Sequence, residues 1–106
     1  PNQKDIQESK DLGANCIEIH TGKLCNLINK KKNYNYELNR IKKAVDFGNK
    51  LGLEVHAGHG LTYESAKIIS KLNGIKELNI GHFLIGESIF VGLSHSIKEF
   101  RKILRL

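Results

Sequence analysis

The sequence predicts an α/β fold built on parallel strands. Short segments with alternating apolar and polar residues recur at 15–20, 53–57 and 77–80. Each is followed by a turn that contains glycine and histidine, and later by a segment with helical spacing. Strands that alternate with helices in this way are joined by right-handed crossovers, which place the strands parallel in one sheet. The predicted order is therefore helix, strand, helix, strand, helix, strand, helix.

The first half of the chain contains one strand between two helical segments. Residues 2–12 have the polar composition of an exposed helix, which ends at Gly13. Residues 15–20 alternate as a half-buried strand does, and we expect residues 23–35 to form a long polar loop. From Tyr36 a helix is predicted that ends near Gly52. Its apolar face carries Leu38, Ile41, Ala44, Val45 and Gly48.

The second half of the chain repeats this cycle twice. Residues 53–57 form a short predicted strand, and Thr62 is a suitable N-cap for the helix that follows. Residues 77–80 form the third strand, and a short segment over 86–92 precedes a last helix from about Ser94. The apolar residues at helical spacing are Ala66, Ile69 and Leu72 in the first of these helices, and Ile97, Phe100 and Leu104 in the second.

The predicted strands have one apolar face and one polar face. Strands of parallel sheets that are covered on both sides usually read as continuous apolar runs. Here aliphatic residues alternate with Glu18, His20, Glu54, His56 and Asn79. An open two-layer sheet with one face in water gives this pattern, and so does a closed barrel with a polar lumen. Three strand–helix units would leave two unpaired edges, whereas a full barrel takes about 250 residues. We therefore expect about the last three βα units of a (β/α)8 TIM barrel, in a single partial domain over residues 1–106.

The length and composition of the chain bound its organisation. Its 106 residues allow one domain, and no apolar run approaches the roughly 20 residues of a membrane span. The polar first residues argue against a signal peptide, and two cysteines are too few for a disulfide scaffold, so we expect a reducing cytoplasm. A chain that has no Met and begins at Pro1 is expected to be processed or to be the C-terminal part of a longer one.

The chain is basic, with 17 Lys and Arg against 11 Asp and Glu, a net charge of +6. Basic domains bind nucleic acid, and phosphorylated metabolites also favour positive potential. Lys30, Lys31 and Lys32 form a run with Lys23 nearby, which is typical of solvated surface. No nucleic-acid motif is present, so a nucleic-acid partner is not the interpretation that we favour.

Two residues have the chemistry for proton transfer or charge stabilisation. His59 stands between two glycines directly after a strand, which leaves its imidazole uncrowded. A purely structural histidine is the alternative. Glu18 lies in the middle of a strand, where burial of a carboxylate costs several kcal/mol unless the group is paired or used. On a solvated sheet face it would need no function.

The segment from Gly81 to Ser88, which begins directly after the third strand, could hold a phosphate. Loops after the last two strands of a barrel, and the N-terminus of a short added helix, bind phosphate through backbone N–H groups. Residues 86–92 suit such a helix. We expect no metal, because no Cys or His pair completes a zinc-binding spacing with His56 and His59.

Three motifs resemble the pyridoxine 5′-phosphate synthase family, and they occur in that family's order. They are residues 17–22 (IEIHTG), 57–63 (AGHGLTY) and 77–82 (ELNIGH), followed by the tail 85–93. The resemblance implies a cytoplasmic (β/α)8 barrel, assembled as a homo-octamer built from dimers. It also implies the condensation of 1-deoxy-D-xylulose 5-phosphate with 3-amino-2-oxopropyl phosphate. The products would be pyridoxine 5′-phosphate, phosphate and water, formed without a metal or an organic cofactor.

The resemblance also implies roles for individual residues. Glu18 corresponds to a glutamate that stabilises charge in the transition states, and His59 to the proton donor. Gly60, Gly81 and His82 correspond to contacts with 3-amino-2-oxopropyl phosphate. The family's other proton-transfer histidine and glutamate lie on earlier strands, so we expect this chain alone to be an incomplete catalyst. Residues 23–35 do not match the family pattern.

Two other functions remain open at this point. One is another phosphate-binding TIM-barrel enzyme of the aldolase or isomerase type, although an aldolase would need a Schiff-base lysine and the predicted strands contain none. The other is a non-catalytic basic α/β module that binds RNA or acidic partners.

Overall fold

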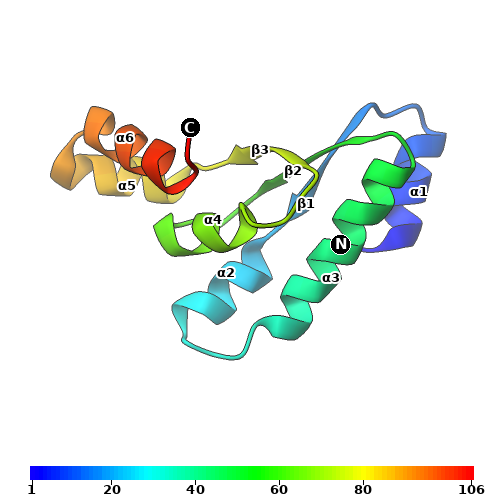
Figure 1. The fold of residues 1–106 in the computed structure, drawn as a ribbon, viewed down its shortest axis with the longest axis horizontal. Helices are drawn as coiled ribbons and strands as arrows, with labels where there is room; N and C mark the ends of the chain where they lie inside the picture. The colour runs from blue at the N-terminus through cyan, green and yellow to red at the C-terminus, as the bar shows by residue number, and fades with distance from the viewer.

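The computed structural model describes residues 1–106 and contains one parallel sheet with helices on one side of it (Figure 1). The sheet has the order β1-β2-β3, with β1 at Cys16–His20, β2 at Glu54–Gly58 and β3 at Ile75–Asn79. The helices are α1 (Gln3–Asp11), α2 (Gly22–Asn29), α3 (Asn35–Lys50), α4 (Tyr63–Ile69), α5 (His82–Val91) and α6 (Leu93–Ile103). The predicted α/β class and the parallel arrangement are confirmed.

The core lies between the sheet and its helix layer. In Figure 1, α2, α3 and α4 lie on one side of the strands, while α5 and α6 pack together beyond the end of β3. Ile19, Val55 and Ala57 point into the core, at exposed fractions of 3% or less. No helix covers the opposite face of the sheet (Figure 1). Glu18, His20 and Glu54 are exposed and alternate with the buried strand residues, so they lie on this face. The two-faced character of the predicted strands is therefore confirmed.

Residues 23–35 do not form the long loop that we expected. Helix α2 occupies Gly22–Asn29, and only the five residues after it connect to α3. Leu24, Cys25 and Ile28 are buried on one side of α2. Because these residues recur at helical spacing within a stretch of asparagine and lysine, the apolar face is short and easily overlooked. Lys30, Lys31 and Lys32 follow α2 and are exposed, as the interpretation as solvated surface requires.

Helices α4 and α5 begin at capping residues. The Thr62 hydroxyl accepts a hydrogen bond from the Ser65 N–H, and the Ser65 hydroxyl accepts one from the Thr62 N–H, so the predicted N-cap of α4 is confirmed. The short helix expected over residues 86–92 is present, but it starts several residues earlier. Gly81 is itself the N-cap of α5, and the helix runs without a break from His82 to Val91.

Strand β3 starts two residues earlier than predicted. Its pairing with β2 shifts between Val55 and His56, because Val55 pairs with Ile75 and His56 pairs with Glu77. Lys76 is the extra residue of this bulge, so one strand does contain a lysine, contrary to the expectation from the sequence. Lys76 lies near the amino end of β3 and is exposed, far along the strand from its carboxyl end.

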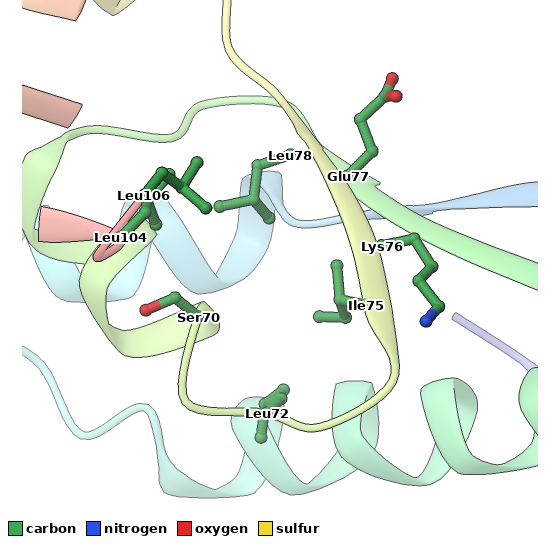
Figure 2. Close-up of a pocket in the computed structure, with 8 residues that line it drawn as sticks. All are labelled: Ser70, Leu72, Ile75, Lys76, Glu77, Leu78, Leu104 and Leu106. Atoms are coloured by element: carbon green, nitrogen blue, oxygen red, sulfur yellow. The ribbon is translucent and has the colours of Figure 1, made fainter. Parts of the chain in front are cut away.

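An apolar groove of about 400 Å³ opens beside β3 on the helix-covered side (Figure 2). Ile75 and Leu78 point into it from the strand, and Leu104 and Leu106 face them from the end of the chain. Figure 2 shows that Lys76 and Glu77 lie on the other side of the strand. The groove is therefore a gap in apolar packing at the free edge of β3 and lies away from the polar face.

None of the helices has the length and the apolar character that are needed to cross a membrane.

Candidate active site

Glu18 is the middle residue of the edge strand β1 and lies on the uncovered polar face of the sheet. A Cβ built on Gly58 would overlap Glu18 Oε1 and would lie 3.0 Å from Asn79 Cβ. The Glu18 carboxylate thus lies over Gly58 of β2, in space that only a glycine leaves free, toward the carboxyl ends of the strands. Glu18 is exposed and no ion pair ties it to the rest of the chain. Its charge is therefore available to a ligand at this edge of the sheet.

His59 occupies an unusual backbone conformation directly after β2. Its φ is +86°, and the φ of Gly60 is +77°. A residue other than glycine at positive φ costs about 1–3 kcal/mol and persists only where the surroundings enforce it. A side chain at Gly60 would also meet Cys25 Cβ at 3.2 Å. From the sequence, the two glycines were expected to supply the unusual backbone angles of this turn. In the structure His59 has a positive φ as well, so it contributes to the turn itself.

His20 lies against His59. The partner of His20 could not be predicted from the sequence. The two imidazole rings stack with centroids 4.3 Å apart and planes 24° apart. His20 Nδ1 accepts a hydrogen bond from the Gly22 N–H at 3.2 Å. A Cβ on Gly22 would lie 2.6 Å from His20 Cε1 and 2.9 Å from His59 Cδ2. Gly22 therefore leaves the space in which the two rings stack.

An open depression of about 510 Å³ separates the histidine pair from α2. Its walls come from the end of β1, the loop after β2 and one side of α2. The lining residues are His20, Gly22, Lys23, Cys25, Asn26, Asn29, His59 and Gly60. The sequence analysis did not place Lys23, Asn26 or Asn29 in a site, because α2 was expected to be a loop and Lys23 was interpreted as solvated surface. Their spacing of three residues is the signal that could have found them.

Gly81 and His82 lie at the same edge of the sheet, beyond the carboxyl end of β3. Gly81 caps α5, His82 is its first residue, and both are exposed. The first N–H groups of a helix have no partner within it and carry partial positive charge, which suits an anion. A Cβ on Gly81 would meet nothing within 4 Å. The N-terminus of α5 is thus open, but it does not line the depression beside His59.

A second polar cluster lies toward the amino ends of the strands. His56 Nε2 lies 2.8 Å from Glu54 Oε1, His56 Nδ1 lies 3.7 Å from Glu77 Oε1, and Cys16 Sγ lies 3.4 Å from His56 Nε2. Desolvation, followed by the carboxylates of Glu54, Glu77 and Glu18, raises the pKa of the Cys16 thiol. No group of three or more His, Cys, Asp or Glu side chains is arranged to hold a metal ion.

The fold and the site define a class of protein. It is a parallel α/β protein whose candidate acid–base and anion-binding groups gather at the carboxyl ends of its strands, the usual place for ligands in such sheets. Residues 1–106 match the family described as "Pyridoxal phosphate biosynthesis protein PdxJ", and the chain belongs to that family.

Individual relatives agree with this assignment. The chain is 53% identical over 103 residues to the pyridoxine 5′-phosphate synthase of Pelagibacter ubique (strain HTCC1062), with 97% of this chain and 43% of that protein covered. It is 49% identical over 104 residues to the synthase of Zymomonas mobilis subsp. mobilis, with 98% and 40% covered. It is 44% identical over 104 residues to that of Sulfurihydrogenibium sp. (strain YO3AOP1), with 98% and 42% covered. The chain therefore spans less than half the length of these relatives.

Proposed function

We propose that this chain forms part of a pyridoxine 5′-phosphate synthase. The enzyme would condense 1-deoxy-D-xylulose 5-phosphate with 3-amino-2-oxopropyl phosphate to give pyridoxine 5′-phosphate, phosphate and water. One observation carries the proposal. His59 stacks on His20, and the Glu18 carboxylate extends toward the same edge of the sheet, in a chain of the PdxJ family. The same edge carries the open N-terminus of α5, which suits a phosphorylated substrate.

The proposed architecture is a (β/α)8 barrel to which residues 1–106 contribute, as one partial domain, about the last three βα units. Two features support it. Strands β1 and β3 each pair on one side only, which leaves edges for further strands. The face of the sheet that no helix covers carries exposed polar residues, as the lumen of a barrel with a site at its carboxyl end does. Closing the sheet would surround Glu18 and raise the strength of its electrostatic interactions.

His59 is the proposed proton donor. Its contacts within the chain are made by its carbonyl oxygen and by stacking of its ring, so the ring nitrogens remain free to exchange a proton with a substrate. Ring closure between the two substrates passes through imine formation, enolisation, loss of phosphate, cyclisation and dehydration. Each of these steps moves a proton, and an imidazole beside the substrate accelerates such transfers by about 10²–10⁴-fold.

Glu18 is the proposed stabiliser of developing charge. Imine formation and the later eliminations pass through cationic nitrogen, and a fixed carboxylate lowers the energy of such states. Gly60, Gly81 and His82 are the proposed contacts to 3-amino-2-oxopropyl phosphate. Gly60 lines the depression beside His59, and Gly81 and His82 present backbone N–H groups at the start of α5. No metal or organic cofactor is part of this proposal.

The proposed setting is a homo-octamer built from dimers in the cytoplasm, with no nucleic-acid or membrane partner. Apolar side chains are exposed on α5 and at the start of α6. They support the proposal that this surface is buried against another protein segment. Ile89 is 78% exposed and Phe90 is 86% exposed on α5, and Leu93 is 50% exposed on α6. A contiguous apolar surface of this kind usually marks a contact with another protein segment.

A synthase assay on the polypeptide as its source makes it tests the proposed function. With both phosphorylated substrates present, pyridoxine 5′-phosphate and inorganic phosphate should appear in a one-to-one ratio, and omission of either substrate should abolish both. The intact mass of that polypeptide, which should be well over twice 11.9 kDa for a barrel, is measured in the same preparation. Release of phosphate without pyridoxine 5′-phosphate would overturn the assignment and would favour another phosphate-binding barrel enzyme.

A further inference from the structure

Thr21 joins the end of β1 to the loop that holds His59. The residue is fully buried. Its hydroxyl oxygen lies 2.8 Å from the carbonyl oxygen of Gly58 and 2.9 Å from that of His59, and its one proton is shared between these two acceptors. Its backbone N–H also donates to the Gly58 carbonyl, at 2.8 Å. One buried side chain therefore contacts both carbonyl groups of the segment that carries the proposed proton donor.

These two carbonyl groups have a special relation to His59. They belong to the two peptide units on either side of the His59 Cα, so fixing both planes fixes φ and ψ of that residue. These two angles set the direction of the Cα–Cβ bond, and stacking on His20 then sets the side-chain torsions that place the imidazole. The φ of His59 is +86°, a conformation that the chain keeps only where its surroundings enforce it.

We propose that Thr21 is a positioning residue for His59, and the inference rests on the proposed role of His59 as proton donor. The Thr21 hydroxyl holds the strained turn, and the turn holds the His59 ring against His20. The Cys25 thiol adds a weaker contact to the His59 carbonyl at 3.6 Å. Without the hydroxyl, the His59 carbonyl keeps only the weak thiol contact and the Gly58 carbonyl keeps only the Thr21 backbone N–H. The loop can then relax toward an ordinary φ that carries the imidazole out of the stack.

Two substitutions separate the hydroxyl from the rest of the side chain. Thr21→Val keeps the shape and removes the donor, and Thr21→Ser keeps the donor. Displacement of a catalytic group by about 1 Å can cost about 10²-fold, so Thr21→Val should lower kcat by about 10–10²-fold and change KM little. Thr21→Ser should retain kcat within about threefold. Ser96→Ala is the matched control, because it removes a buried hydroxyl without a partner on α6.

A double-mutant cycle asks whether Thr21 acts through His59. In a His59→Asn background the positioned group is gone, so Thr21→Val should lower the remaining kcat by no more than about threefold. The proposal would be overturned if Thr21→Val lowered kcat by the same factor with His59 and with Asn at position 59. Full kcat in the Thr21→Val single variant would also overturn it. If Thr21→Val does not fold, Thr21→Cys, whose thiol is a weaker donor of similar size, takes its place in the same cycle.

The imidazole resonances of His20 and His59 give a readout that does not need turnover. Loss of the stack in Thr21→Val should shift both sets of ring resonances, and Thr21→Ser should leave them near their original positions. Unchanged resonances in a folded Thr21→Val variant would overturn the positioning role. Absence of synthase activity in the unmodified protein would instead overturn the proposed function, and the resonances would still decide whether Thr21 positions His59.

Discussion

The imidazole of His20 stacks on that of His59, with 4.3 Å between the ring centroids. One ring comes from the last residue of β1 and the other from the turn after β2, so the contact joins two neighbouring strand ends. Because His20 Nδ1 accepts a hydrogen bond from Gly22, the neutral form of His20 carries its proton on Nε2. The pair therefore combines one imidazole that is oriented by a hydrogen bond with one that is held by stacking alone.

Replacement of His59 by Asn should lower kcat by about 10²-fold or more, because a lost general acid usually has an effect of this size. Steady-state kinetics with both phosphorylated substrates provide the measurement. His95→Asn is the control, since His95 is exposed on α6 and should leave kcat unchanged. Full activity of His59→Asn would remove His59 from the proposed mechanism.

Replacement of Glu18 by Gln should lower kcat by at least about tenfold, because the amide cannot stabilise a developing positive charge as a carboxylate does. The free energy of unfolding should change by no more than about 0.5 kcal/mol, since Glu18 is exposed and makes no ion pair. Kinetics and urea unfolding measure the two effects, and Glu64→Gln on α4 is the matched surface control. An unchanged kcat together with a more stable fold would make Glu18 only a tolerated charge.

Gly58→Ala should lower kcat because it displaces the Glu18 carboxylate. The added Cβ would occupy the position of Glu18 Oε1, so the carboxylate must move away from the strand ends. We expect a loss of kcat close to that of Glu18→Gln, and the double variant should be little worse than either single one. Gly86→Ala is the control, because its Cβ would meet nothing within 4 Å on α5. It should raise the free energy of unfolding by about 0.5–1 kcal/mol. Additive losses in the Gly58→Ala/Glu18→Gln variant would contradict the link between the two residues.

Cys16 should react with iodoacetamide more slowly than an ordinary thiol near neutral pH. Its pKa is raised by desolvation and by the carboxylates of Glu54, Glu77 and Glu18, and only the thiolate is nucleophilic. The rate should therefore rise with pH up to values above about 8.5, the usual thiol pKa. The neutral thiol is the form that the fold favours, so its contribution to stability is complete below that usual pKa and is lost as the pH rises through the raised one.

Mass-spectrometric labelling at several pH values checks this prediction. Glu54→Gln should speed labelling of Cys16 at fixed pH, because it removes one of the carboxylates that raise the thiol pKa. Cys25 is 2% exposed and should be labelled only after unfolding. Labelling of Cys16 that is already maximal at neutral pH would contradict the raised pKa.

Local patterns were enough to predict most of the fold. Alternation of apolar and polar residues located all three strands, and the Thr62 cap located the start of α4. The same reasoning missed α2, because Leu24, Cys25 and Ile28 are too few to stand out among polar neighbours. It also moved the start of α5 several residues downstream, since a glycine after a strand is as typical of a loop as of an N-cap.

The candidate site was predicted in its parts but not in its contacts. His59 and Glu18 were recognisable by residue type and by their place in the strand pattern. The contact of Thr21 with His59 spans 38 residues of sequence, and Glu18 reaches Gly58 across a strand pair. No local pattern records which side chains meet over such separations, because strand register and sheet twist decide it.

The sequence by itself therefore determined the three strands, most of the helices, their order and the polarity of each sheet face, because these depend on periodicity and capping over a few residues. Only the tertiary structure decided that His20 stacks on His59, that Thr21 holds the turn beneath it and that Gly58 makes room for Glu18. Those contacts arise when parallel pairing brings the carboxyl ends of β1, β2 and β3 to one edge, where residues far apart in the chain become neighbours.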